Sequence, residues 1–257
     1  HTVAGVGIGC PGTVDDTDGM VLYSNNLDWS NFAMGPYLKE RLGLPVRLAN
    51  DANAAALGEA LAGCAKGADS AVILTLGTGV GGGVVLGGKL LTGYTGAAAE
   101  PGHMVVNDAP DAPLCTCGRR GCLEAYASAT ALIRMTKDAM AAHPESALWK
   151  LADLDTVTGR TAFDGRDAGD AAAAAVVAEY THWLAVGIAN LVNIFFPQVV
   201  GLSGGVANQG EALLAPLRAQ VEPMVFGSAF ARKKTTLTTC TLGYRAGVIG
   251  AGLLAQR

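Results

Sequence analysis

The sequence has little charge and few aromatic residues. Asp, Glu, Lys and Arg make up 16% of its 257 residues and aromatic residues 6%, and the formal net charge is −4. We therefore expect no nucleic-acid partner, because phosphate binding needs clustered Lys and Arg. Half of the residues are hydrophobic, which is enough for a substantial core and argues against a disordered chain.

Long hydrophobic runs are also missing. The longest apolar stretch covers residues 184–196 and is interrupted by Asn190 and Asn193, whereas a membrane-spanning helix needs about 20 apolar residues. No basic segment followed by an apolar one opens the sequence, so no secretory signal is visible. We expect a cytoplasmic location and no membrane partner.

Segments with strand-like and helix-like patterns alternate along the sequence. Such alternation predicts an α/β fold in which helical crossovers join parallel strands. The polar, acidic residues 151–170 are expected to form a surface excursion. The expected strands cover residues 3–8, 20–23, 46–49, 71–76, 84–86, 199–202 and 235–241, and the expected helices residues 34–42, 52–65, 124–142, 170–196, 210–221 and 246–255.

Three of the six cysteines lie within one short segment. Cys115, Cys117 and Cys122 follow His103, and three thiolates with one imidazole form a complete tetrahedral set for Zn²⁺. Four protein ligands leave no open coordination position, so the predicted metal is structural. The alternatives are a Cys115–Cys122 disulfide or buried thiols, and a reducing compartment with His103 nearby favours zinc.

A polar pair, Asn50-Asp51, stands between an expected strand and an expected helix. Ligands of open α/β sheets bind beyond the carboxyl ends of the strands, so Asp51 is a candidate general base. Asn and Asp are equally suited to capping the helix that follows, and these residues alone favour the capping role.

Two glycine-rich turns follow expected strands. In Gly77-Thr78-Gly79, backbone N–H groups can hold a phosphate, and Thr78 can add a hydroxyl donor. This segment matches neither the Walker A loop nor the dinucleotide fingerprint, and a glycine-rich hairpin is the alternative. Gly204 and Gly205 join a strand to a helix, where the backbone can approach a nucleotide or form an ordinary turn.

Six motifs, taken in order, resemble those of the ROK family of bacterial sugar kinases and repressors, within the actin-like ATPase (ribonuclease H-like) superfold. Residues 25–29 and 246–251 make the sequence most similar to the glucokinases of Gram-positive bacteria within that family. The six motifs occupy residues 11–12, 50–55, 76–83, 100–103, 115–124 and 203–205.

The resemblance implies transfer of phosphate from ATP to O6 of a hexose, above all D-glucose, with Mg²⁺ as a further cofactor and structural Zn²⁺. Asp51 matches the catalytic base. The sugar-binding positions would be Asn26, Asn50, Asp51, Glu100, His103 and Glu124. The nucleotide-binding positions would be Gly77, Thr78, Gly79, Gly204 and Gly205, and the zinc ligands His103, Cys115, Cys117 and Cys122.

The resemblance also implies two lobes and a homodimer. Residues 1–64, joined by a terminal helix over residues 243–257, would form the remainder of a small N-terminal lobe, and residues 65–242 a large lobe with the zinc and nucleotide loops. The first phosphate loop of family kinases has no counterpart in this sequence, so the N-terminal lobe is expected to be incomplete. The alternatives are an N-acetylglucosamine or N-acetylmannosamine kinase, a sugar-binding repressor and an inactive fragment.

Overall fold

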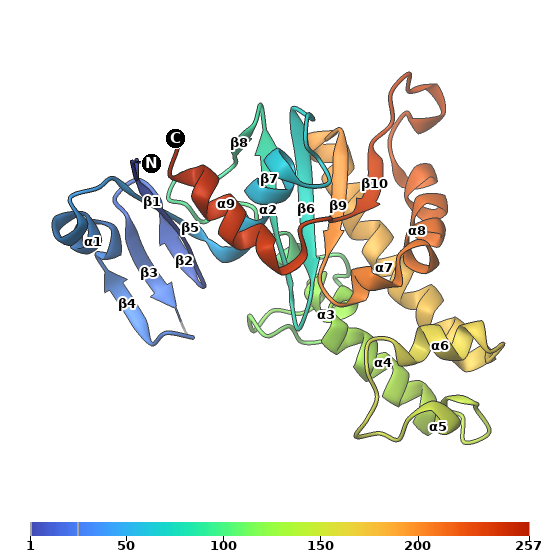
Figure 1. Cartoon of the computed structure of the whole chain (residues 1–257). Helices are drawn as coiled ribbons and strands as arrows, with labels where there is room; N and C mark the ends of the chain where they lie inside the picture. Colours follow the sequence, from blue (N-terminus) through green and yellow to red (C-terminus); the bar gives the residue numbers. More distant parts are fainter. Residues whose placement is uncertain (1, 25, 257) are drawn as a thin grey trace.

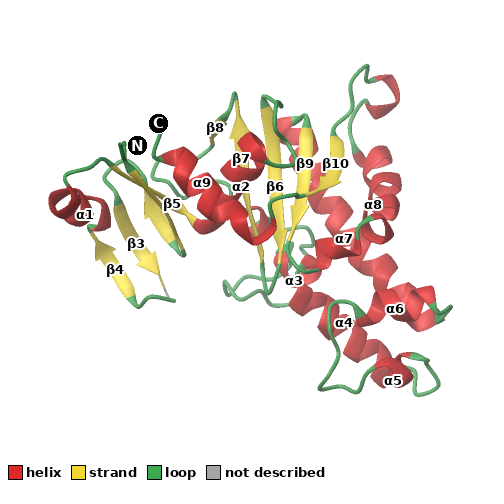
Figure 2. Ribbon diagram, in the orientation of Figure 1, coloured by secondary structure: helices red, strands yellow, loops and turns green. Residues whose placement is uncertain are grey.

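The computed structural model describes residues 2–24 and 26–256, and its central feature is a five-stranded mixed sheet (Figures 1 and 2). The sheet contains, in spatial order, β10 (Thr236–Thr239), β9 (Val199–Ser203), β6 (Ser70–Leu76), β7 (Val80–Leu86) and β8 (Lys89–Leu90). The first three strands are parallel, whereas β7 is antiparallel to β6 and β8 to β7. The expected α/β class is confirmed.

β6 is apolar on both faces because helices cover both sides of the sheet. Leu74 belongs to the main core, which includes α7 (Ala171–Phe195), and Ile73 to a smaller cluster under α2 (Asp51–Ala62). The other helices beside the main core are α3 (Glu124–Ala127), α4 (Ala129–Ala142), α6 (Thr161–Asp167) and α8 (Glu211–Met224), and the short α5 (Leu148–Leu151) packs on α6.

The N-terminal part of the chain forms two smaller sheets. β1 (Val6–Cys10) pairs in parallel with β5 (Val46–Asn50). An antiparallel sheet carries β2 (Thr13–Asp15), β3 (Met20–Ser24) and β4 (Trp29–Phe32), and is followed by α1 (Met34–Leu42). Asn25, the first residue of the motif at 25–29, lies outside the described residues.

α7 is long and apolar enough, by length and composition, to cross a membrane, and half of its most apolar window is buried in the protein. Tyr180, Leu184 and Ile188 lie on its buried side in the main core, and the Tyr180 hydroxyl donates a hydrogen bond to the Ala127 carbonyl at 2.8 Å. Packing within this core accounts for the apolar residues on the buried side of the helix.

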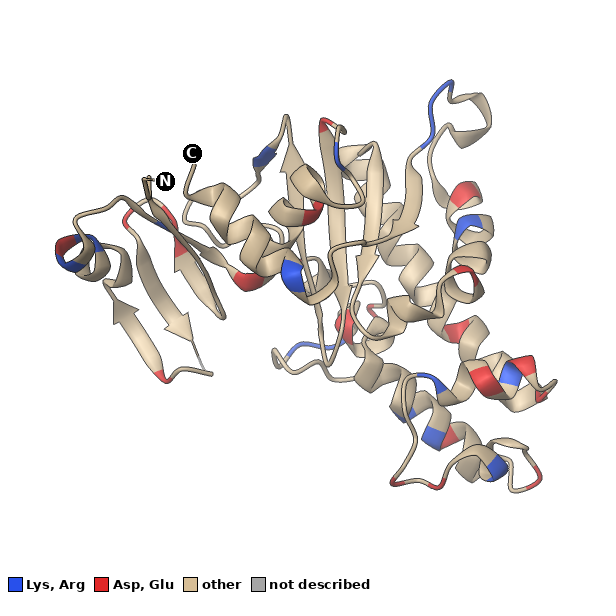
Figure 3. Cartoon of the chain, in the orientation of Figure 1, with Lys and Arg blue, Asp and Glu red and all other residues tan. Residues whose placement is uncertain are grey.

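Charged side chains of both signs are mixed in Figure 3, where Lys and Arg are spread over several elements. Arg134 pairs with Asp138 along α4 at 3.6 Å, and Arg160 pairs with Asp164 at the start of α6 at 3.0 Å. Exposed pairs of this kind contribute little to stability.

The terminal helix α9 (Ala246–Leu254) packs on α2 and β1 through glycines (Figure 1). A Cβ atom at Gly250 would lie 1.7 Å from the Ala54 carbonyl oxygen, and one at Gly58 would lie 2.3 Å from that of Ala246. The two helices therefore approach so closely only because these positions lack side chains. This contact supports the predicted grouping of residues 243–257 with residues 1–64, which stays a prediction.

We expect Gly250→Ala to lower the free energy of unfolding by about 1–3 kcal/mol, because its Cβ atom would push α9 off α2. Gly247, in the same helix, is the matched control because a Cβ atom there meets nothing within 4 Å. Gly247→Ala should raise stability by about 0.5–1 kcal/mol through better helix propensity. Urea unfolding measures both, and equal effects would contradict the close-packing argument.

Several expected elements differ in detail. The single helix expected over residues 124–142 is two helices, because Ser128 leaves the helical conformation and caps α4 through a hydrogen bond from Ala131 N–H. Strand β7 starts at Val80 rather than 84 and contains part of the glycine run. The surface excursion over residues 151–170 includes α6, whose Phe163 is buried in the main core. β2, β4 and β8 were not predicted.

Candidate active site

A pocket of about 440 Å³ opens where the start of α2, the β6–β7 turn and the segment around His103 meet. Two groups of predicted residues line it. One is five of the six sugar-binding positions, Asn50, Asp51, Glu100, His103 and Glu124, and the other is the turn Gly77, Thr78 and Gly79. Asn26, the sixth sugar-binding candidate, is exposed in the turn before β4 and does not line the pocket.

Asn50 and Asp51 have separate roles at the start of α2. Asn50 caps the helix, since its Oδ1 accepts hydrogen bonds from Ala52 N–H at 2.9 Å and Asn53 N–H at 3.2 Å. Its Nδ2 donates to the Gly12 carbonyl at 2.9 Å. Asp51 is the first helical residue, exposed to the pocket, and within residues 2–24 and 26–256 its carboxylate accepts a hydrogen bond only from the adjacent Ala52 N–H. Asp51 is thus available for chemistry, and the helix dipole favours its negative charge.

Glu100 precedes the short 3₁₀ helix η1 (Pro101–His103), and His103 is its last residue; both line the same pocket. Glu100 is exposed. Partial removal of water by the pocket walls raises the pKa of its carboxyl, the charge of His103 lowers it, and the negative charges of Asp51 and Glu124 raise it further. The pocket therefore gathers three carboxylates and an imidazole, a set suited to binding several hydroxyl groups.

Glu124, the first residue of α3, is held by hydrogen bonds at both carboxylate oxygens. Oε2 accepts from Val80 N–H at 3.0 Å, and Oε1 accepts from the Thr116 hydroxyl at 2.6 Å. A Cβ atom at position 79 would lie 2.3 Å from Oε2. Gly79, predicted only as a phosphate-loop residue, is therefore also needed to make room for Glu124.

The turn at residues 77–79 is anchored to the start of α4. The Gly77 carbonyl accepts from Ala129 N–H at 2.8 Å, and the Thr78 carbonyl accepts from the Thr130 hydroxyl at 2.8 Å. A Cβ atom at Gly77 would meet nothing within 4 Å, so the backbone there faces open space.

A second pocket, of about 620 Å³, is bordered by Ala129, Gly205 and the 3₁₀ helix η2 (Val206–Gln209). Gly204 has φ +90°, and a Cβ atom there would lie 2.3 Å from the Leu76 carbonyl oxygen, so the tight turn requires glycine. Position 205 is open, with nothing within 4 Å of a Cβ atom. Because Ala129 borders this pocket and also bonds Gly77, the two predicted nucleotide segments are neighbours.

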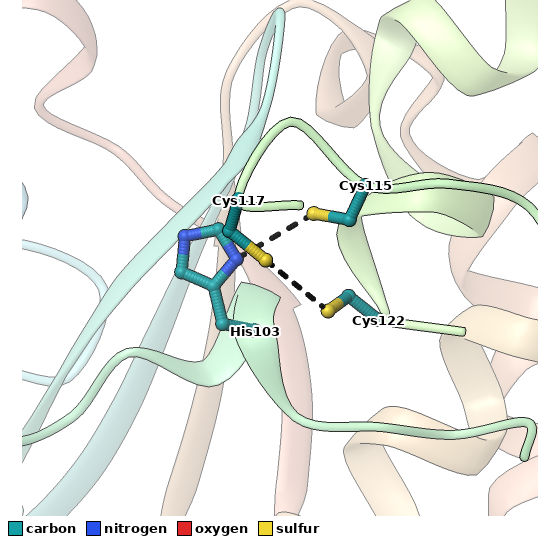
Figure 4. Close-up of side chains that lie close together, drawn as sticks. All are labelled: His103, Cys115, Cys117 and Cys122. Carbon is teal, nitrogen blue, oxygen red and sulfur yellow. Dashed lines mark hydrogen bonds between the residues drawn. The ribbon is translucent and has the colours of Figure 1, made fainter. Parts of the chain in front are cut away.

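The four predicted metal ligands converge (Figure 4). All four ligand atoms of His103, Cys115, Cys117 and Cys122 lie within 4.8 Å of one another. The Cys117 and Cys122 sulfurs are 3.7 Å apart, as are Cys115 Sγ and His103 Nδ1. A tetrahedral zinc ion with Zn–S of about 2.3 Å and Zn–N of about 2.0 Å has ligand–ligand edges of about 3.5–3.8 Å.

The cysteine chemistry of this loop also fits a metal. All six cysteines are free. Hydrogen bonds from Arg119 lower the pKa of the exposed Cys117 thiol to about 6, whereas burial raises the pKa of Cys122 to about 12. A cation at the centre of the cluster would favour the thiolate form of all three residues.

Residue patterns alone missed the hydrogen bonds that hold Glu124. Thr116 lies between two cysteines, and its only sequence signal was that position. Val80 contributes a backbone N–H, which carries no sequence signal. Both contacts depend on α3 starting at Glu124, beside β7.

The sequence profile of the ROK family matches residues 1–257. A glucokinase of Halalkalibacterium halodurans is 40% identical over 98% of this chain and 76% of its own length. A xylose repressor of Caldicellulosiruptor bescii is 32% identical over 96% of this chain and 61% of its own length. The crystal structure of a ROK family glucokinase from Streptomyces griseus in complex with glucose and AMPPNP has a TM-score of 0.83 at 39% identity, covering 100% of this chain and 82% of that one.

These similarities confirm the expected actin-like sugar-kinase fold and the expected likeness to glucokinases of Gram-positive bacteria. The ordered motifs, the pocket that they line and the match over residues 1–257 agree. The chain belongs to the ROK family.

Proposed function

We propose that this chain is an ATP-dependent hexose kinase that phosphorylates O6, with D-glucose as its substrate. The observation that carries the proposal is one pocket lined by the Asp51 carboxylate, by Glu100, His103 and Glu124, and by the glycine turn at residues 77–79. The glucokinase relatives support the choice of sugar.

Asp51 is the proposed general base. A sugar hydroxyl is a weak nucleophile, and its transfer to phosphorus depends mainly on positioning and charge neutralisation. Asp51 would orient the 6-hydroxyl and accept its proton as the new P–O bond forms. Asn50 helps to fix that carboxylate because it caps the helix that carries Asp51. Glu100, His103 and Glu124 would bind ring hydroxyls in the same pocket.

ATP fits the two glycine segments. The open space at Gly77 and Gly205 is what close backbone approach to a ligand requires, because any side chain would occupy it. Gly77, Thr78 and Gly79 would hold phosphates, and Gly204 and Gly205 would border the adenosine in the second pocket. Mg²⁺, when bound with ATP, would neutralise part of the negative charge of the phosphates.

Structural zinc fits His103, Cys115, Cys117 and Cys122. Coordination through Nδ1 would fix the orientation of the His103 ring, which also lines the pocket. The metal would therefore hold the hydroxyl-binding wall in place without entering the reaction. We further propose a cytoplasmic homodimer. The almost fully exposed Phe226 and Phe230 support self-association.

Calorimetric titration of the chain with D-glucose and, in parallel, N-acetylglucosamine and N-acetylmannosamine tests the sugar. Glucose alone should bind, and a coupled assay with ATP should then show its phosphorylation. Binding of an acetylated sugar alone would favour the alternative kinase. Sugar binding without phosphorylation would instead favour a repressor, as in the xylose-repressor relative, or an inactive fragment.

A further inference from the structure

A chain of hydrogen bonds crosses from the cysteine loop to the glycine turn. The Thr116 hydroxyl donates to Glu124 Oε1 at 2.6 Å, and Val80 N–H donates to Glu124 Oε2 at 3.0 Å. Cys115 Sγ also lies 3.5 Å from Oε1. Thr116 stands between two predicted zinc ligands, and Val80 directly follows the turn at residues 77–79. One carboxylate thus joins three parts of the site.

Of these contacts, the hydrogen bond from the Thr116 hydroxyl to Glu124 is the one that a side-chain substitution can remove without altering the metal ligands or the strand. As a zinc ligand, Cys115 would be a thiolate and would no longer donate to Glu124. The Val80 N–H is fixed by strand β7. Among the described residues, the Thr116 hydroxyl is then the side-chain donor that, together with Val80 N–H, sets which way the carboxylate turns about its terminal bond. Each carboxylate oxygen can accept more than one hydrogen bond, so the arrangement leaves capacity for sugar hydroxyls.

We propose that Thr116 is a positioning residue, whose hydroxyl orients the Glu124 carboxylate and thereby couples the cysteine loop to the sugar site and to the glycine turn. The inference rests on the proposed sugar-binding role of Glu124. Thr116 itself is exposed and does not line the pocket, so it acts through Glu124.

The first test is sugar affinity. Thr116→Val, which keeps the shape but removes the hydroxyl, should raise the Kd for D-glucose about 10- to 100-fold, as expected for a lost hydrogen bond to a charged group. Thr116→Ser should restore affinity to within about threefold. Thr156→Val is the matched control, because it removes a hydroxyl that bonds the Asp153 carboxylate at 2.8 Å on a surface loop. Zinc content is measured for each variant.

Gly79→Ala should displace the same carboxylate through its other oxygen, because the added Cβ atom would lie 2.3 Å from Glu124 Oε2. It should weaken glucose binding to a similar extent. Unchanged glucose affinity in Thr116→Val, or failure of Thr116→Ser to restore it, would overturn the proposal.

A second measurement does not depend on sugar. The amide proton resonance of Val80, whose N–H bonds Glu124, should move in Thr116→Val and return in Thr116→Ser. If the unmutated chain binds no hexose, the proposed function fails while this resonance still decides the positioning role. A Val80 resonance unchanged by Thr116→Val would refute it.

Discussion

Asp51→Asn should lower kcat for glucose phosphorylation by about 10²–10⁴ while changing glucose affinity little. The substitution keeps the size and hydrogen-bonding shape of the side chain but removes the group that accepts the proton. Helix α2 should remain, because Asn50 and not Asp51 provides its cap. The loss of charge at the helix start should cost only about 0.3–1 kcal/mol of stability. Steady-state kinetics and calorimetry on the same preparation measure the two effects.

Glu211→Gln is the matched control for that experiment. Glu211 is also an acidic first residue of a helix, and it lies outside both pockets. Neutralising it should leave kcat unchanged while weakening a surface ion pair with Arg218. A kcat for Asp51→Asn within tenfold of the unmutated chain would reject Asp51 as the base.

The parts of the fold that sequence patterns predicted are those in which local and long-range preferences agree. The helix at residues 34–42 was placed with its observed bounds, because its periodic apolar residues end at Gly43, which adopts φ +65°. By contrast, the single helix expected at residues 124–142 is interrupted at Ser128, which separates α3 from α4. A serine within a helical pattern gives no local sign of whether it will cap a new helix.

The site shows the same division. The cysteine cluster and the Asn50-Asp51 junction were recognisable because their chemistry depends on residue types at short spacing. The double role of Gly79 could not be recognised from the sequence. It depends on Glu124, which belongs to a separate helix and whose Oε2 would lie 2.3 Å from a Cβ atom at position 79. The choice between Asn50 and Asp51 as cap likewise needed the geometry, because both residue types cap helices well.

Removal of a zinc ligand should have the second large effect, a loss of zinc affinity together with glucose affinity. Structural zinc binds with about 10–16 kcal/mol, so removing one of four ligands should cost about 2.5–4 kcal/mol, or roughly 10²–10³ in zinc affinity. We expect one zinc ion per unmutated chain, and Cys122→Ala should lose it during dialysis against a weak chelator. Glucose affinity should fall with it, because His103 is both a predicted ligand and part of the pocket wall.

Cys10→Ala separates the metal effect from the loss of a buried thiol. Cys10 and Cys122 are both buried, with exposed fractions of 2% and 0%, but Cys10 lies in the small N-terminal core and far in sequence from the metal cluster. Its substitution should therefore cost stability while retaining zinc. Elemental analysis that finds no zinc in the unmutated chain, with mass spectrometry showing a Cys115–Cys122 disulfide, would contradict the metal site.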